Sequence, residues 1–183
     1  YTVKRGIDTV ADPEFVEANM ISVPGVWQPT VTDHVIGVAE SRADCLGVID
    51  IENVYTADSE STNNFQNRLG SVTTAVNSLK DRRINSSYAC TYYPWVRIRD
   101  NISNASLWVP PSVIAIGTFA SSEAKAELWF APAGFSRGGL STGAGGWPVL
   151  STTERLRRKD RDDLYEANIN PIATFPSEGI VIF

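Results

Sequence analysis

Residues 46–51 read Leu-Gly-Val-Ile-Asp-Ile, an almost continuous apolar run. Such a run is typical of a strand that is covered on both faces, as in a parallel sheet. Upstream, residues 20–23 predict a short strand that stops at a Pro-Gly pair, and apolar residues at helical spacing predict a helix over residues 29–42. A strand, a helix and a strand in this order predict a βαβ unit.

The rest of the chain continues this alternation of helices and strands. In chain order, the patterns predict a helix over 64–82, a strand over 88–99, a returning strand over 107–109, a helix from Pro110-Pro111, an extended piece over 128–133, a helix over 155–167 and a hairpin of 172–175 with 180–183. Together they predict one α/β domain with some α+β character, in which helices and β-hairpins flank a mixed sheet.

Local signals refine these boundaries. Pro94 lacks an N–H, so it marks an edge, an end or a bulge of its strand. Ser151 and Glu154 have the spacing of a capping box and predict a helix start, and Asn168 falls where a left-handed residue would end that helix. Six glycines over 134–148 predict a flexible loop.

Length and composition exclude several classes of protein. The 183 residues suit one domain, and 43% hydrophobic with 20% charged residues excludes a collagen, a disordered tail and a coiled-coil rod. No apolar run reaches the roughly 18 residues that a membrane span needs. With 16 basic and 21 acidic residues the net charge is −5, which argues against generic nucleic-acid binding.

The candidate catalytic groups are few. His34 is the only histidine, and we predict a surface or partly packed side chain there rather than a catalytic base. Asp50 ends a buried strand, where we predict a turn or cap residue. Residues 143–146 read Gly-Ala-Gly-Gly without the Lys of a phosphate loop, so a flexible connector is favoured. Cys45 and Cys90 are predicted to be buried, reduced thiols. We predict no cofactor, no metal site and no enzyme activity.

Six groups of residues, in order, carry a resemblance to a known family. They are residues 21–26 (ISVPGV), 39–44 (AESRAD) leading into 48–50 (VID), 92–96 (YYPWV), 108–112 (WVPPS), 129–134 (WFAPAG) and 162–172 (DDLYEANINPI). In this order and spacing they resemble the tail sheath proteins of contractile-tailed bacteriophages, the myovirus-type sheath family, over about residues 20–183.

The resemblance implies a structural protein of the virion, assembled in the bacterial host cytoplasm. Sheath subunits stack as hexameric rings around a tail tube, and their contraction drives the tube through the host envelope. The implied partners are further copies of the chain, the tail tube protein, and baseplate and tail terminator proteins, with no nucleic acid and no membrane anchor. Because the chain ends at Phe183 inside an apolar run, we expect residues 1–183 to be a single sheath-type domain from a longer chain, without its terminal arms.

One charged segment is a candidate contact with the tube. It contains Arg155, Arg157, Arg158 and Lys159 in an acidic protein. We hypothesise that this basic segment faces an acidic tube until contraction. The alternative, a solvated helix face paired with Asp160, Asp162 and Asp163, stays open.

Two other functions remain open. A small α/β enzyme or nucleotide-binding domain would gain thermal stability from a small ligand. A monomeric adaptor of the tail or baseplate would bind one partner without polymerising.

Overall fold

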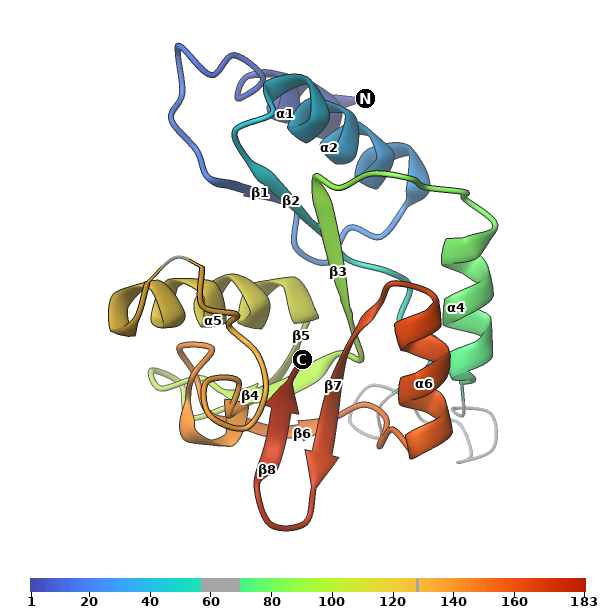
Figure 1. Ribbon diagram of the computed structural model, residues 1–183, viewed down its shortest axis with the longest axis vertical. Coiled ribbons are helices and arrows are strands. Elements are labelled where there is room, and N and C mark those ends of the chain that lie inside the picture. The colour runs from blue at the N-terminus through green and yellow to red at the C-terminus, as the bar shows by residue number, and fades with distance from the viewer. Residues whose placement is uncertain (57–69, 128) are drawn as a thin grey trace.

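The structure is a computed structural model that describes residues 1–56, 70–127 and 129–183. Its strands are β1 (Met20–Ser22), β2 (Leu46–Ile49), β3 (Ala89–Tyr93), β4 (Val96–Arg99), β5 (Ser106–Val109), β6 (Val149–Thr152), β7 (Asn170–Phe175) and β8 (Gly179–Ile182). A five-stranded sheet has the order β1-β2-β3-β7-β8, and a three-stranded sheet has the order β5-β4-β6 (Figure 1). The first four strands of the larger sheet run parallel and β8 returns antiparallel, so the predicted mixed sheet is confirmed.

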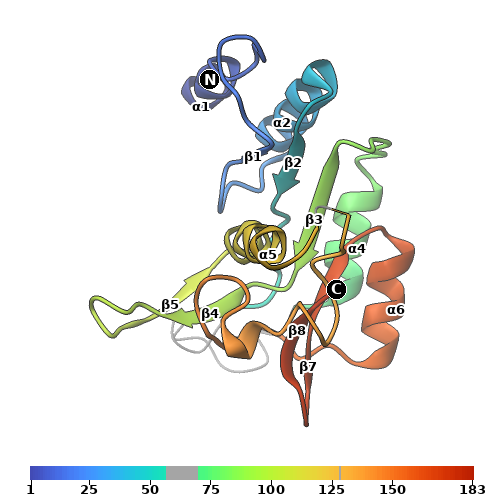
Figure 2. The same cartoon turned by 60° about the vertical axis from the view of Figure 1, so that its left-hand side comes forward.

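Helices cover both faces of the larger sheet. The helices are α1 (Thr2–Asp8), α2 (Pro29–Arg42), α4 (Val72–Lys80), α5 (Pro111–Lys125), α6 (Arg158–Glu166) and the short 3-10 helix η2 (Leu140–Thr142). Figure 2 shows β3 and β7 between α5 on one side and α4 with α6 on the other. None of the helices in the described part of the chain has the length and hydropathy needed to cross a bilayer.

The alternation of side chains along the buried strands explains these layers. Val48 and Tyr92 pack with Ile114 of α5 in one cluster. Their neighbours Ile49 and Tyr93 point to the opposite face, where Ile49 packs against α2 and Tyr93 against α4 and α6. Because both faces are covered, the strands read as apolar runs, as the sequence of β2 predicted.

The predicted strand over 88–99 is divided at Pro94. The Tyr93–Pro94 peptide bond is cis, and the chain passes there from β3 in one sheet to β4 in the other. Of the three predicted roles of Pro94, the strand end is therefore the correct one. The predicted hairpin is confirmed, since β4 pairs antiparallel with β5.

The capping box predicted at Ser151 is wrong. Ser151 lies in β6 and pairs with Arg97 of β4, and the helix begins later, at Arg158. There the Asp160 carboxylate accepts the backbone N–H of Arg157 at 2.8 Å. The predicted end of this helix is confirmed, because Asn168 has a left-handed backbone with φ of 58°.

Other boundaries also shifted. Of the predicted helix over 64–82, α4 confirms residues 72–80, whereas residues 64–69 lie outside the described residues. Leu128 is also outside them, and residues 129–133 form no strand but an irregular segment with a turn at Trp129 and bends at Phe130 and Pro132. The hairpin of β7 with β8 is confirmed. Helix α1 was not predicted.

The glycine-rich segment 134–148, predicted as a flexible loop, is a connector that packs against the core through part of its length. Its Leu140 is fully buried in the core beside α5 and β8. Gly145 lies against Gly117 of α5 so closely that a Cβ at Gly117 would stand 2.2 Å from the Gly145 carbonyl oxygen. The glycines therefore allow close backbone approach here.

Candidate functional site

Asp50 closes the carboxyl end of β2. Its Oδ2 accepts the N–H of Gly25 at 2.8 Å and the hydroxyl of Ser112 at 2.7 Å, and its Oδ1 accepts the N–H of Ser112 at 3.1 Å. The carboxylate thus holds the turn after β1 and caps the first turn of α5. Burial raises the pKa of Asp50 above its usual range, and the three donors oppose that shift. The predicted turn or cap role is confirmed.

The sheet does not offer the usual ligand position of an open α/β fold. Such folds bind ligands outside the carboxyl ends of their strands, where the strand order reverses. Among the described strands, the parallel ones follow each other as β1-β2-β3-β7 without a reversal. The described part of the sheet therefore has no switch point, and the groups around Asp50 are already bonded to one another.

His34 links two helices at the surface. Its Nε2 lies 2.6 Å from the Asp8 Oδ1, which joins α2 to α1, and its side chain is 30% exposed. The prediction of a partly packed surface histidine is confirmed, and the hydrogen bonds of Asp50 do not involve it.

The two cysteines are apolar packing groups. Both are free thiols, with Cys45 buried and Cys90 half-buried beside the core. Burial raises the pKa of both thiols, that of Cys90 to about 12, so neither is a thiolate near neutral pH. Within the described ranges, no three His, Cys, Asp or Glu side chains gather closely enough to hold a metal ion.

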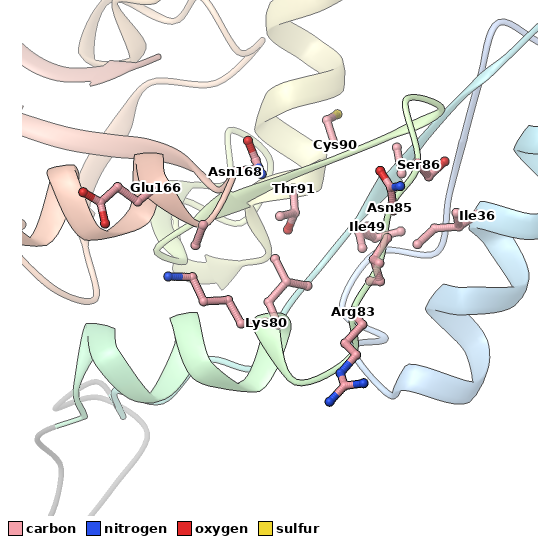
Figure 3. A pocket seen from close by; sticks show the side chains of 14 residues that line it. Ile36, Ile49, Lys80, Arg83, Asn85, Ser86, Cys90, Thr91, Glu166 and Asn168 are labelled. Atoms are coloured by element: carbon pink, nitrogen blue, oxygen red, sulfur yellow. The ribbon is translucent and has the colours of Figure 1, made fainter.

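A cavity of about 530 Å³ opens between α2, the end of α4, the start of β3 and the end of α6 (Figure 3). Its walls include the apolar side chains of Ile36, Ile49, Leu79 and Ile84. Thr91 also lines it and is 4% exposed, and its hydroxyl has no hydrogen-bond partner among the described residues. The cavity is therefore lined by both apolar and polar side chains, and includes one buried hydroxyl without a partner among the described residues.

Charged residues surround the mouth of this cavity. Lys80 and Arg83 are exposed there and form no ion pair within the described part of the chain, while Glu166 lies at the end away from Ile36 (Figure 3). Nearby, Arg82 Nη2 donates to the Thr32 hydroxyl at 2.7 Å and also contacts Asp33. These contacts join the turn after α4 to α2 beside the cavity.

The sequence did not point to this cavity. Its lining comes from residues between Ile36 and Asn168 that only the fold brings together. The one feature visible in the sequence is the pair of cations Lys80 and Arg83 at and just after the end of α4. Cations at this place are common, because they complement the negative end of the helix dipole, so they do not by themselves indicate a cavity.

The basic segment 155–159 lies just before and within the first turn of α6. Arg155, Arg157, Arg158 and Lys159 are all exposed, whereas Leu156 between them is buried. Among the described residues, none of the four cations forms an ion pair with an acid. Glu154, the next acid in the sequence, accepts the Tyr93 hydroxyl at 3.0 Å, and burial raises its pKa.

Comparison by sequence finds phage relatives. The chain is 27% identical over 156 residues to the tail sheath protein of Enterobacteria phage T4, which covers 84% of this chain and 23% of that protein. It is 25% identical over 193 aligned positions to the tail sheath protein of Vibrio phage KVP40, covering 97% of this chain and 27% of that protein. The chain thus spans about a quarter of the length of these relatives. No family model matches it.

Comparison by structure finds contractile assemblies. A chain of the anti-feeding prophage baseplate aligns over 99% of this chain with a TM-score of 0.64 and 16% identity. A chain of the contracted anti-feeding prophage sheath aligns over 97% with a TM-score of 0.57 and 20% identity. A chain of the contracted PVC sheath complex of an extracellular contractile injection system aligns over 96% with a TM-score of 0.62 and 16% identity.

The structural comparisons support the fold alone. The two sequence relatives are tail sheath proteins, the family that the six groups of residues predicted. The chain is therefore a relative of the tail sheath proteins of contractile-tailed phages.

Proposed function

We propose that this chain is part of a structural subunit of a contractile phage tail sheath, and that it has no catalytic role. The observation that carries the proposal is the alignment of 84% and 97% of the chain with two proteins that are both tail sheath proteins. The subunits stack as hexameric rings around a tail tube in the virion, after assembly in the bacterial cytoplasm. They contract to drive the tube through the host envelope.

The chemistry of the described residues supports a role in assembly. Asp50, His34 and both thiols are each occupied by packing or by bonds within the fold. A contractile sheath stores free energy in two alternative sets of contacts between rigid subunits, and this needs buried, interlocked elements rather than a reactive centre. Sheath, tube, baseplate and terminator proteins are the partners that this role requires.

Negative-stain electron microscopy of the full-length protein tests the proposal. We expect tubular polymers that form by self-association and that coat the tail tube when it is supplied. A protein that stays monomeric, with or without the tube, would contradict it. A small-molecule ligand that raises the melting temperature would instead favour the alternative, a small α/β enzyme or nucleotide-binding domain.

The basic segment is the proposed contact with the tube. Cations in the first turn of a helix face the positive end of its dipole, so Arg158 and Lys159 raise the free energy of α6. Asp160 offsets part of this cost. Glu154 interacts with Arg157 at longer range, but none of the four cations forms an ion pair within the described residues, so an acidic tube surface would relieve the remaining repulsion.

Reversing two of these charges should weaken the binding of the sheath to its tube. We expect Arg157→Glu with Arg158→Glu in the full-length protein to lower the affinity for tubes by about tenfold at low salt, because exposed ion pairs contribute about 0.2–1 kcal/mol each and reversal adds repulsion. Co-sedimentation with tubes over a range of salt concentrations measures this.

A matched control reverses two cations elsewhere. Lys4→Glu with Arg5→Glu changes the net charge equally but lies in α1. Unchanged binding of the Arg157 and Arg158 variant at every salt concentration would remove the tube contact and leave the sheath proposal in place.

A further inference from the structure

The loop between α1 and β1 presents an acidic, aromatic projection. Phe15 in this loop is 85% exposed, and Asp12, Glu14 and Glu17 near it in the sequence are exposed acids. In Figure 1 this loop projects at the upper left, away from the body of the molecule. Phe15 is one of several large apolar side chains that the described part of the chain exposes, and it is flanked by acids; aromatic residues contribute strongly where they lie at a contact site.

The loop is held in a defined conformation. The Asp12 carbonyl accepts the N–H groups of Phe15 at 3.3 Å and Val16 at 3.1 Å, and the Asp12 carboxylate accepts the N–H of Glu14 at 2.9 Å. Arg42, buried at the end of α2, donates to the Val16 carbonyl at 3.0 Å. A projection that is already ordered loses little conformational entropy when it docks.

The cavity beside α4 has the complementary chemistry. Apolar side chains form one part of its walls and polar side chains such as Asn85 and Asn168 form the rest. Its volume of about 530 Å³ accommodates an aromatic ring, and Lys80 and Arg83 in its lining lack acid partners among the described residues. Although Glu166 at the far end adds one acid, the two cations outnumber it.

We propose that the α1–β1 loop of one copy of this chain docks into the cavity of a second copy. Phe15 enters between Ile36, Leu79 and Ile84, and the carboxylates beside it pair with Lys80 and Arg83. The inference rests on the proposed sheath role and adds the identity of one contact between subunits. Charge complementarity selects a second copy as the occupant, because the chain itself carries both halves of the contact.

The two halves lie on separate parts of the molecule. The loop lies beyond α1, whereas the cavity lies between α2 and α4 (Figure 1). Both can therefore be used at once, and each docked copy offers a free loop and a free cavity to further copies. Such a heterologous contact propagates into rings or helices rather than ending at a dimer.

Phe15→Ala in the full-length protein tests the contact. Because the side chain is exposed, its loss should leave folding unchanged, while the critical concentration for assembly rises by about tenfold or more. Light scattering measures assembly and circular dichroism verifies the fold. Ile102→Ala is the matched control, since Ile102 is 96% exposed at the β4–β5 turn and should not change assembly.

A charge exchange makes the test specific for this pairing. Glu14→Lys with Glu17→Lys, and separately Lys80→Glu with Arg83→Glu, should each raise the critical concentration about tenfold, and the quadruple variant should restore it. Assembly of all these variants at the wild-type concentration would overturn the contact but not the sheath role. Failure of the wild-type protein to assemble would overturn the sheath role itself.

Discussion

Asp50→Ala is expected to lower the free energy of unfolding by about 3 kcal/mol or more. The substitution leaves three donors without their acceptor, namely the N–H of Gly25 and the N–H and hydroxyl of Ser112. Each buried donor that loses its partner costs about 1–3 kcal/mol. Urea unfolding of the variant beside the wild-type chain, followed by tryptophan fluorescence, measures the loss.

The pH dependence of the free energy of unfolding shows how the charge of Asp50 contributes to stability, apart from the space that its side chain fills. Burial raises its folded-state pKa, so its contribution to stability is fully present below the unfolded pKa of about 3.9 and is lost as the pH rises through the folded value. Asp50→Asn does not titrate and keeps the shape. We therefore expect the stability difference between the wild type and Asp50→Asn to shrink as the pH rises from about 4.

Two results would contradict this account of Asp50. A stability difference that grows with pH would mean that the hydrogen bonds to the carboxylate outweigh its burial. An Asp50→Ala variant as stable as the wild type would mean that the turn at Gly25 and the start of α5 do not depend on the carboxylate.

The parts of the fold that the sequence predicted are those with local causes. Strand β2 is an apolar run because it is covered on both faces, and α2 shows helical spacing because one side of it packs on the sheet. The hairpin of β7 with β8 was predicted because its turn ends at Gly179, which has φ of 76°. Each of these signals lies within about 15 residues of sequence.

Strand β6 was missed because its cause is distant. Ser151 becomes a strand residue by pairing with Arg97, 54 positions earlier in the chain, while its spacing to Glu154 imitates a helix start. Pairing partners far apart in sequence leave no local periodicity. The capping pattern alone therefore led to the wrong element.

Among the candidate sites, too, the features with a local sequence signal were predicted and those built from distant elements were not. Asp50 was assigned correctly as a turn or cap residue from its position at a strand end, but its partners Gly25 and Ser112 are far from it in the chain. A short helical turn through Phe15 follows from the sequence of residues 12–18, but the cavity and the exposure of Phe15 were not predicted, because exposure and hollow shape arise only when distant elements pack together. Sequence patterns identify buried residues far better than they identify contact surfaces.

Gly117→Ala should be strongly destabilising although alanine is the better helix former. The new Cβ would stand 2.2 Å from the Gly145 carbonyl oxygen, which belongs to backbone and cannot move away as a side chain would. Overpacking of this kind costs about 1–3 kcal/mol, more than the roughly 1 kcal/mol that alanine contributes over glycine within a helix. The connector 134–148 would have to move away from α5.

Gly37→Ala is the matched control, and its expected effect has the opposite sign. Gly37 lies inside α2, is exposed, and a Cβ there would meet no atom within 4 Å. Only the helix propensity then acts, so we expect the free energy of unfolding to rise by up to about 1 kcal/mol. Paired urea titrations of the two variants measure both effects. If both substitutions stabilised the chain, α5 and the glycine connector would not be in contact, and the packing of Leu140 beneath α5 would need another cause.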